Sequence, residues 1–284
     1  MSSWQQGSGQ IDIVPRNRIQ TTRSGRLVSV HMGGGIGNRL FQIMAGLGYA
    51  ERTGRQFVFY EEHMTHNPHT NPRATKELLL ALFPRVKVHR ERMRWNQCVE
   101  EKGSHYSHNT IPDISGSIVL HGYFQNFEYF PVGVRDSWTV PRPKECRYDC
   151  SGLDFAHTYF VHFRLGDYVD SEFDMDKRPY YTEAVRSIRA ADPVATFLVF
   201  SDQPAKLKLE DYGLMTEDVR IVPPFIGIWE SLYLMSRCSG AICANSSFSW
   251  FGAFGIRGNG PIFMPAIWSR LHTSCPNPPW VQSL

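Results

Sequence analysis

Glycines, hydrogen-bond donors and a helix start occur together in Gly33–Arg39, which has the sequence GGGIGNR. Gly35 and Gly37 would let a ligand approach the backbone closely, and the N–H groups at the start of the next helix attract anions. The spacing is not a dinucleotide-binding fingerprint, because Asn38 stands where the third glycine belongs, and no P-loop lysine follows. The glycines alone also suit a tight turn without a ligand. Asn38 and Arg39 add donors and favour a binding turn.

A second segment, Val161–Tyr168 (VHFRLGDY), ends a predicted strand in charged side chains. Alternation along the strand places His162 and Arg164 on the same side. A guanidinium there could hold a phosphate through two parallel hydrogen bonds. Asp167 could orient that guanidinium, or the two could form an ion pair that only holds the loop. The residues by themselves leave phosphate binding and a structural ion pair equally open.

Small polar residues fill a third junction between a predicted strand and a predicted helix, at Cys243–Trp250 (CANSSFSW). One Asn or Ser would serve as an ordinary N-cap, but Asn245, Ser246 and Ser247 exceed what one cap needs. Their side chains and the helix N-terminus suit a second phosphate. Phe248 would pack in the core or against a nucleotide.

Glu230 lies near the start of another predicted helix. An acidic residue is favoured there by the helix dipole alone. Its carboxylate could instead accept both N–H donors of a guanine edge. With the three segments above, it indicates a site that binds a nucleotide diphosphate mainly through arginine and backbone amides.

Patterns that would bind a metal ion are weak. The chain has six cysteines but no CxxC pair, so we expect free thiols and no structural zinc site. His63, His66 and His69 lie close together in HMTHNPH, but Pro68 breaks any helix there. We interpret these histidines as part of a polar loop that contacts an acceptor substrate. The only DxD sequence, at 174–176, lies in a predicted loop, and we therefore expect no metal cofactor.

Composition favours a folded chain with a sizeable core. Hydrophobic residues make up 42% of the 284 residues and charged residues 20%, which argues against disorder and fits two domains or one large α/β domain. The formal net charge of +3 is too balanced for a nucleic-acid binder. No apolar run approaches the roughly 18 residues of a membrane span, and the N-terminus lacks a signal-like apolar region. We expect a soluble, cytoplasmic protein.

Short apolar runs alternate with helical patterns once a polar tail at 1–25 has passed. This alternation predicts parallel sheets covered by helices on both faces. The predicted strands are Leu27–Met32, Gln56–Tyr60, Val86–Val88, Ile118–His121, Thr158–Phe163, Thr196–Phe200, Val219–Val222, Ala241–Cys243 and Pro261–Phe263. The predicted helices are Ile36–Arg52, Thr75–Phe83, Tyr180–Ala191, Gly227–Cys238 and Phe248–Gly255.

The pattern breaks at 140–150, which contains Pro141, Pro143 and several charges. We place a linker there, between an N-terminal domain at 26–145 and a C-terminal domain at 146–284. Each would be a Rossmann-like α/β unit, with a cleft between the two. In open α/β sheets ligands bind beyond the carboxyl ends of the strands, and the three polar segments fall at such ends.

Five segments together resemble one family, the GDP-fucose-dependent α1,2-fucosyltransferases. The glycine turn is similar to that family's GGLGNQ(L/M)FQ, His121–Phe130 (HGYFQNFEYF) to its GYFQ…YF segment, and VHFRLGDYV to its HxRRxDY motif. Leu198–Asp202 (LVFSD) resembles a strand end of the family, and Leu232–Ala253 resembles its LMS-C…ANSSFSWWGA block. These matches come in family order over most of residues 28–270.

This resemblance implies a GT-B-like fold, with an acceptor-binding N-terminal domain and a donor-binding C-terminal domain. It implies inverting, metal-independent transfer of L-fucose from GDP-β-L-fucose to a glycan hydroxyl. Arg164, Asn38 and Asp167 would be catalytic, with Arg164 on the β-phosphate. The implied donor-binding residues are Gly35, Gly37, His162, Arg164, Ser201, Asp202, Glu230, Asn245, Ser246, Ser247 and Phe248. The acceptor side would include Arg39, His63, His66 and His69.

The chain departs from the family pattern at three positions. Leu165 replaces the motif's second arginine, Arg39 stands where glutamine is usual, and Glu230 stands where relatives in the wider superfamily carry aspartate. The general base stays open between Asp167, Glu61 and Glu62, or the phosphate itself suffices. Three alternatives also stay open: another linkage or acceptor, a non-catalytic nucleotide-sugar-binding protein, and a nucleotide-dependent oxidoreductase. Animal Golgi relatives carry a membrane anchor that we do not find in this sequence, and we therefore expect a bacterial or viral enzyme.

Overall fold

Two six-stranded sheets organise the chain, one in each of two units. The computed structural model describes residues 10–15, 26–65, 71–90, 95–102, 106–271 and 277–284. Unit 1 extends to Ser137 and unit 2 begins at Trp138. No helix within the described ranges is long and apolar enough to cross a membrane.

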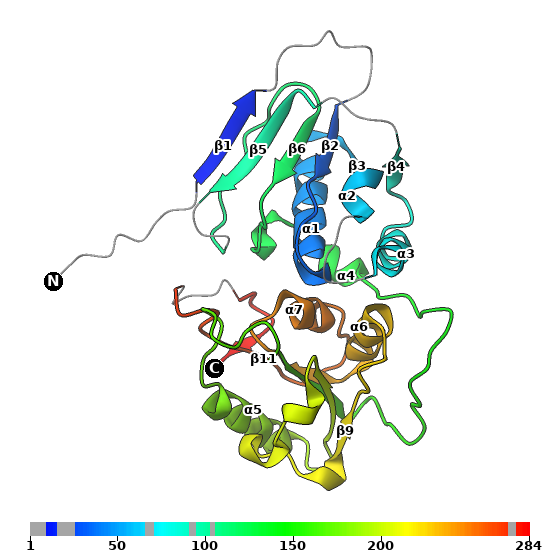
Figure 1. Ribbon diagram of the computed structural model, residues 1–284, viewed down its shortest axis with the longest axis vertical. Coiled ribbons are helices and arrows are strands. Elements are labelled where there is room, and N and C mark those ends of the chain that lie inside the picture. The colour runs from blue at the N-terminus through cyan, green and yellow to red at the C-terminus, as the bar shows by residue number, and fades with distance from the viewer. Residues whose placement is uncertain (1–9, 16–25, 66–70, 91–94, 103–105, 272–276) are drawn as a thin grey trace, which may run out of the picture. The chain divides into compact units, whose positions relative to one another are not determined.

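The sheet of unit 1 has the order β1-β5-β6-β2-β3-β4 and is parallel except for its edge strand β1 (Figure 1). From β2 the chain continues to β3 and β4 on one side, whereas β6 and β5 lie on the other side. The segment after β6 packs against the helix that follows β2, because the Phe130 ring lies 5.5 Å from that of Phe41. The strands are β1 (Gln10–Pro15), β2 (Leu27–Val30), β3 (Gln56–Tyr60), β4 (Lys87–His89), β5 (Gln97–Lys102) and β6 (Ile118–His121).

Helix α1 (Ile36–Thr53) packs closely on one face of this sheet because of a glycine at its centre. A Cβ on Gly46 would lie 2.4 Å from the Phe57 ring and 2.8 Å from Val30. The helix ends at Gly54, whose φ of 63° is in the left-handed region. The other helices of unit 1 are α2 (Glu61–Thr65), α3 (Pro72–Leu82) and α4 (Val134–Ser137), with the 3-10 turn η1 (Phe127–Tyr129).

The sheet of unit 2 has the order β12-β11-β10-β7-β8-β9 and is parallel throughout. Its connections diverge between β7 and β10. Helix α5 covers one face, and α6 and α7 lie on the other (Figure 1). The face under α5 holds an apolar cluster that includes Val161 and Phe163 of β7 and Tyr181 and Ile188 of α5. His162 alternates with Val161 and Phe163 and therefore lies on the face of α7.

The strands of unit 2 are β7 (Thr158–Phe163), β8 (Thr196–Ser201), β9 (Val219–Ile221), β10 (Gly240–Ile242), β11 (Ile262–Met264) and β12 (Gln282–Ser283). Its α-helices are α5 (Arg178–Ala191), α6 (Ile228–Arg237) and α7 (Ser247–Phe254). The 3-10 turns η2 (Pro204–Lys206), η3 (Leu209–Tyr212) and η4 (Thr216–Asp218) connect β8 to β9.

The structure confirms the α/β class and the two Rossmann-like units, while the cleft between them stays a prediction. The predicted strands at 56–60, 118–121 and 158–163 coincide with β3, β6 and β7. Helix α3 begins three residues earlier than predicted, at Pro72. The Asn71 side chain caps it by accepting hydrogen bonds from the N–H groups of Arg73 and Ala74.

Strand β1 is a correction to the predicted tail at 1–25. It pairs antiparallel with β5, which the sequence analysis also does not predict. Backbone hydrogen bonds and an ion pair between Asp12 and Lys102 hold this pair together. Neither strand carries a strong apolar alternation, so the pairing comes from the edge that β5 offers.

The two units divide before the predicted linker at 140–150, between Ser137 and Trp138. Trp138 belongs with unit 2 because its ring lies 6.0 Å from that of Phe251 and 5.7 Å from that of Phe254. Its carbonyl also accepts a hydrogen bond from Arg257. One aromatic contact thus moves the start of unit 2 toward the N-terminus.

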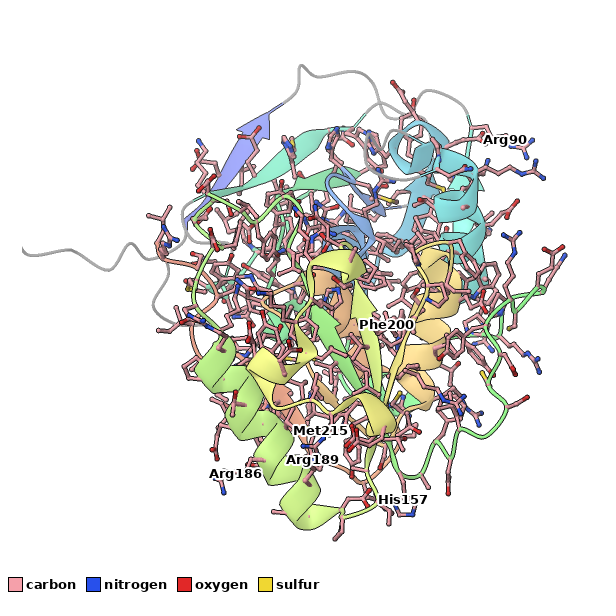
Figure 2. All side chains as sticks on the ribbon, turned by 60° about the horizontal axis from the view of Figure 1, so that its bottom comes forward. Arg90, His157, Arg186, Arg189, Phe200 and Met215 are labelled. Carbon is pink, nitrogen blue, oxygen red and sulfur yellow. The ribbon has the colours of Figure 1, made fainter. Side chains whose placement is uncertain are left out.

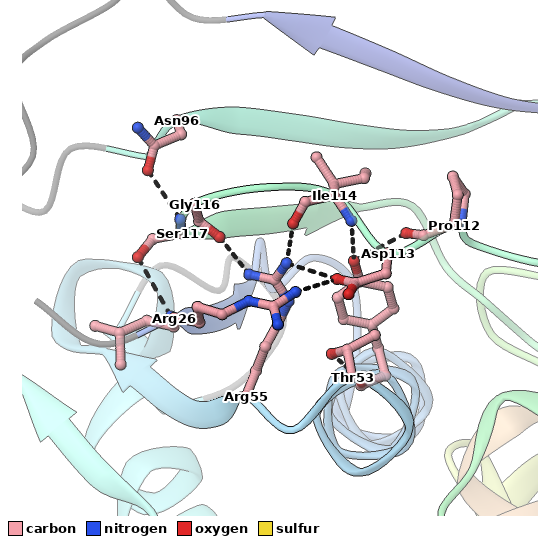
Figure 3. Close-up of polar contacts among 11 residues, drawn as sticks. Arg26, Thr53, Arg55, Asn96, Pro112, Asp113, Ile114, Gly116 and Ser117 are labelled. Atoms are coloured by element: carbon pink, nitrogen blue, oxygen red, sulfur yellow. Dashed lines mark hydrogen bonds and ion pairs between the residues drawn. The ribbon is translucent and has the colours of Figure 1, made fainter.

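A buried arginine fastens the end of α1 to the loop before β6 (Figure 3). The Arg55 side chain has no exposed surface and donates to the carbonyls of Gly116 and Ile114. It also donates to Asp113 Oδ1 at 2.9 Å, and Asp113 pairs with the exposed Arg26 as well. One guanidinium therefore satisfies two carbonyls and a carboxylate from a loop about 60 residues away in sequence.

We expect Arg55→Met to lower the free energy of unfolding by about 2–4 kcal/mol, because it leaves buried carbonyls without donors. Arg73→Met is the matched control, since that side chain is 88% exposed and pairs with Glu77 four residues on. Chemical denaturation monitored by circular dichroism measures both. Equal midpoints for the two variants would contradict this role of Arg55.

Candidate functional site

Three loops of unit 2 meet where the sheet connections diverge. They follow β7, β8 and β10, which are neighbours in the sheet and run parallel. The loops contain Arg164, Asp202 and Ser246 respectively. Loops at the carboxyl ends of strands beside such a divergence are the usual ligand site of an open α/β sheet. The second and third predicted segments are thus brought together.

Arg164 is the central cation of this site. Its Nε donates to Asp167 Oδ1 at 2.9 Å, and its Nη1 lies 3.3 Å from Asp202 Oδ2. The guanidinium also lies over the Tyr168 ring, 5.8 Å from the centroid. Burial lowers the pKa of Arg164, but the hydrogen bond to Asp167 and the charge of Asp202 outweigh it and raise that pKa. The predicted ion pair exists, and Nη2 has no partner among the described residues.

Asp202 fixes the loop that follows β7. Its two carboxylate oxygens accept hydrogen bonds from the N–H groups of Leu165 and Gly166, each at 2.9 Å. A Cβ on Gly166 would lie 2.7 Å from Asp202 Oδ2, so glycine permits this approach. Ser201, one residue earlier, accepts from the N–H of Gln203 at 3.1 Å. Asp202 thus orients the arginine and its backbone together.

His162 lies under this loop as a neutral ring. It is 5% exposed, its ring centroid is 5.7 Å from that of Phe248, and Nδ1 has no hydrogen-bond partner in the part of the chain that the structure describes. Burial, and then the charge of Arg164, lower the pKa of His162 to about 3. A buried polar atom without a partner is uncommon in a folded protein and suits a group that a ligand completes.

The loop after β10 divides its polar residues between structure and surface. Ser246 is the N-cap of α7 and accepts from the N–H of Phe248 at 3.4 Å. Asn245 is fully buried and donates to the carbonyls of Trp268 and Phe173. Ser247, the first residue of the helix, is half-buried. Ser247 and the amino end of α7 are therefore the parts of this segment best exposed to an anion.

Glu230 is buried and accepts two backbone hydrogen bonds at 2.7 Å, from the N–H groups of Arg147 and Tyr148. Two N–H donors on one carboxylate is the pattern predicted for a guanine edge, but here the donors come from the chain itself. The carboxylate thereby ties the segment before β7 to the start of α6. Its guanine-reading role stays a prediction.

A pocket of about 290 Å³ lies beside Arg164 within unit 2. Leu165, Tyr168 and Lys177 line it together with Arg164. Lys177 Nζ donates to the Phe173 carbonyl at 2.9 Å and lies 5.7 Å from the Tyr168 ring centroid. Burial lowers the pKa of Lys177 to about 8. The sequence gives no signal for a role of Lys177, because this residue is separated from the VHFRLGDY segment and lies before a helix of ordinary composition.

The predicted glycine turn follows β2, whose neighbour in the unit 1 sheet is β6. Asn38 Oδ1 accepts from Gln125 Nε2 at 2.8 Å, which joins the start of α1 to the loop after β6. Gln42 completes the junction: its Oε1 accepts from the N–H of Gly33, and its Nε2 donates to the carbonyl of Gly122. Gly35, the N-cap of α1, and Gly37, at the second position of the helix, are part of the same turn. The HGYFQ and GGGIGN segments are therefore hydrogen-bonded to each other in unit 1.

One of the residues predicted to bind the acceptor, Arg39, lies in the interior of unit 1. Arg39 is fully buried and donates to the carbonyls of Gly34 and Met64, so it braces the turn from behind. His63 Nδ1 lies 3.1 Å from the Val30 carbonyl. Glu61 is paired with Lys76 and Arg90, and the hydrogen bond from Lys76 lowers its pKa.

Two further predicted acceptor residues, His66 and His69, lie outside the described residues. Asp167 and Asp202 both pair with Arg164, and Asp174 and Asp176 also line the pocket beside it.

A model of glycosyl transferase family 11 matches residues 51–269. An alpha-1,2-colitosyltransferase from Escherichia coli is 26% identical over an alignment of 261 residues, and the match covers 80% of this chain and 87% of that protein. Among solved structures, the alpha-1,6-fucosyltransferase NodZ co-crystallised with GDP is 14% identical, with a TM-score of 0.40, and covers 82% of this chain and 93% of that chain. A structure of fucosyltransferase NodZ from Bradyrhizobium is 13% identical, also with a TM-score of 0.40, over 82% and 94% of the two chains.

We expect Asp202→Ala to loosen the loop after β7, because Leu165 and Gly166 lose the acceptors of their N–H groups. Their amide hydrogens should exchange with solvent at least about tenfold faster in hydrogen-exchange mass spectrometry, as a loss of about 1.4 kcal/mol would give. Asp176→Ala, which removes an exposed ion pair with Arg178, is the control. Unchanged exchange in Asp202→Ala would refute the anchoring role.

We expect the ring of His162 to stay neutral between pH 5 and 8, because burial holds its pKa near 3. His157, labelled in Figure 2, should titrate above its ordinary value of 6.5, because its hydrogen bond to Asp192 raises its pKa. The folded-state pKa of His162 lies below its unfolded value, so the neutral ring stabilises the fold fully above about pH 6.5. That contribution is lost as the pH falls from there toward 3. Imidazole NMR titration checks both rings, and a His162 midpoint near 6 would contradict the assignment.

Proposed function

The chain belongs to glycosyl transferase family 11, and from that premise we propose that it transfers L-fucose from GDP-β-L-fucose to a hydroxyl of a glycan acceptor. The proposed reaction inverts the anomeric centre, needs no metal ion and forms an α1,2 linkage. The observation that carries the proposal is Arg164, held by Asp202 beside the start of α7 at the divergence of the unit 2 sheet.

Negative charge grows on the β-phosphate oxygen as the bond from the sugar to that oxygen breaks. Fixed donors aimed at such a charge stabilise the transition state without reorganisation. Arg164 supplies a guanidinium whose orientation Asp202 sets, and the amino end of α7 supplies backbone N–H groups and the positive end of the helix dipole. These donors take the place that a divalent cation holds in metal-dependent transfer.

The phosphate must compete with Asp167 for Arg164. Asp167 is 60% exposed, whereas Asp202 is 22% exposed and is also bound to two backbone amides. Asp167 is therefore the partner that a diphosphate displaces, while Asp202 keeps the guanidinium in place. Once displaced, Asp167 is a carboxylate beside the reacting centre, which favours it over Glu61 as the general base, because Glu61 is bound by Lys76.

The remaining assignments follow the positions around Arg164. The neutral His162 offers Nδ1 to the nucleotide, Ser246, Ser247 and Phe248 hold phosphate and sugar, and Glu230 reads guanine if the donor replaces the amides of Arg147 and Tyr148. In unit 1, Asn38 would face the reacting centre. Leu165 stands where the family motif has a second arginine. Arg164 is therefore the main phosphate ligand in this proposal.

A second candidate is transfer of colitose, the 3-deoxy counterpart of fucose. It is favoured by the 26% identity to an enzyme called alpha-1,2-colitosyltransferase. That name also supports the α1,2 linkage. The two donors differ by one hydroxyl, so a site that hydrogen-bonds the 3-hydroxyl would reject colitose strongly. Parallel rate measurements with both GDP sugars decide between them.

We expect Arg164→Ala to lower the transfer rate by about 10²–10³-fold, the usual effect of removing one fixed donor to a developing charge. Wild-type calorimetry with EDTA present should show binding of GDP-fucose in preference to UDP-galactose and NADH, with GDP-mannose as a second GDP sugar, and the variant should lose it. Arg186→Ala is the matched control. That side chain is 70% exposed, pairs with Glu183 and projects from α5 (Figure 2).

Three outcomes would overturn parts of this proposal. Binding of NADH in place of GDP sugars would support the oxidoreductase alternative. Binding of GDP-fucose without transfer or hydrolysis would support a non-catalytic protein. Product linkages other than α1,2, read by NMR, would correct the linkage while keeping the donor.

A further inference from the structure

A row of polar side chains crosses the sheet of unit 1 on the face away from α1. Residues at matching positions of neighbouring strands point to the same face. The register pairs Asp12 with Glu100 and Glu100 with His121. His31 follows β2, its N–H donates to the Leu120 carbonyl, and its ring lies 4.8 Å from that of His121. Val30 faces α1, so its neighbour His31 faces away from it.

Cys98 joins this row from within β5. It lies two residues before Glu100 on the same strand and therefore points to the same face. One ligand atom from each of Cys98, Glu100 and His121 can be chosen so that all three lie within 4.8 Å of one another. Three different donor types, a thiol, a carboxylate and an imidazole, thus converge from two neighbouring strands.

This donor set matches the chemistry of Zn²⁺. Zinc binds thiolate, imidazole and carboxylate ligands at about 2.0–2.3 Å, in tetrahedral sites whose ligand atoms are roughly 3.3–3.8 Å apart. Side-chain rotations that move the ligand atoms by about 1 Å would bring their separations, which are at most 4.8 Å, into this range. Three protein ligands with a fourth position open is the arrangement of zinc sites that keep a water or a substrate group.

The surroundings favour such a site. Cys98 is 3% exposed, so the soft ligand is shielded, while Glu100 is half-buried and His121 is exposed, which leaves a path for the ion. Lys102 engages Asp12 at the next position of the row, so Glu100 is the acidic member that faces His121. The His31 ring next to His121 could take the fourth position in place of water.

We propose that Cys98, Glu100 and His121 form a binding site for a transition-metal dication of the Zn²⁺ class, which links β5 to β6. The thiol of Cys98 gives up its proton to solvent when the ion binds. The site lies within unit 1 and does not rest on the proposed transfer reaction. It also revises the expectation of no metal, which considered cysteine pairs, the histidine loop and the DxD sequence but not ligands joined by strand register.

Cobalt is the probe, because Co²⁺ takes the same ligands and its visible spectrum reports coordination number and thiolate bonding. The full chain, first dialysed against a chelator, is titrated with Co²⁺ and then with Zn²⁺. We expect one Co²⁺ per chain, intense four-coordinate bands with a thiolate charge-transfer band, and loss of both on adding Zn²⁺, which binds more tightly. Only the pale spectrum of hydrated Co²⁺ would overturn the proposal.

Variants assign the ligands. Cys98→Ser should abolish the thiolate band, and Glu100→Gln and His121→Asn should each weaken Co²⁺ binding by at least about tenfold, the lower end of what loss of a supporting contact costs a metal site. Cys146→Ser, which removes an exposed free thiol, is the matched control and should keep the spectrum. If circular dichroism shows that Cys98→Ser does not fold, the other two variants decide. A thiolate band that persists in folded Cys98→Ser, or unchanged affinity in Glu100→Gln or His121→Asn, would refute the site.

Discussion

The divergence of chain connections at the middle of the unit 2 sheet is the constraint on which the Arg164 site depends. In unit 2 the chain leaves β7 toward β8 and β9, whereas β10 starts the other half of the sheet. The loops after β7 and β10 must therefore turn to opposite faces, and a space remains between their starting points. In unit 1 the loops after the neighbouring strands β2 and β6 meet instead, because Asn38 accepts a hydrogen bond from Gln125. Residues distant in sequence meet there without any local signal that they will.

Charge in the unit 2 site is arranged so that one cation can change partners. Arg164 has one well-fixed carboxylate, Asp202, and one exposed carboxylate, Asp167. Asp202 stays in place because it also accepts backbone hydrogen bonds. Asp167 is screened by water, so in the proposed reaction a stronger anion displaces it from Arg164. Below them His162 stays uncharged, so it adds no repulsion to the guanidinium. In the proposed function, the ion pair that holds the loop and the cation that binds phosphate are two states of the Arg164 side chain.

Burial explains where residue-by-residue interpretation fell short. Arg39 has the type expected at a substrate surface, yet it is buried and donates to backbone carbonyls of its own chain. A charged side chain next to a tight turn is also the means by which that turn is fixed, and the sequence does not distinguish the two uses. Strands β1 and β5 escaped prediction because their pairing relies on backbone hydrogen bonds at a sheet edge rather than on an apolar pattern.

The amino-acid sequence by itself determined the α/β alternation, the extents of β3, β6 and β7, and the segments that carry donors, because periodicity, glycine and helix capping act over a few residues. Tertiary structure alone decided which of these segments meet. Asp202 reaches Leu165 and Gly166, and Glu100 reaches His121, only because parallel strands place their carboxyl ends side by side. Strand order and register are set by packing of the whole sheet. No local pattern encodes them, so the contacts around Arg164 and the grouping of Glu100 with His121 are visible only in the folded chain.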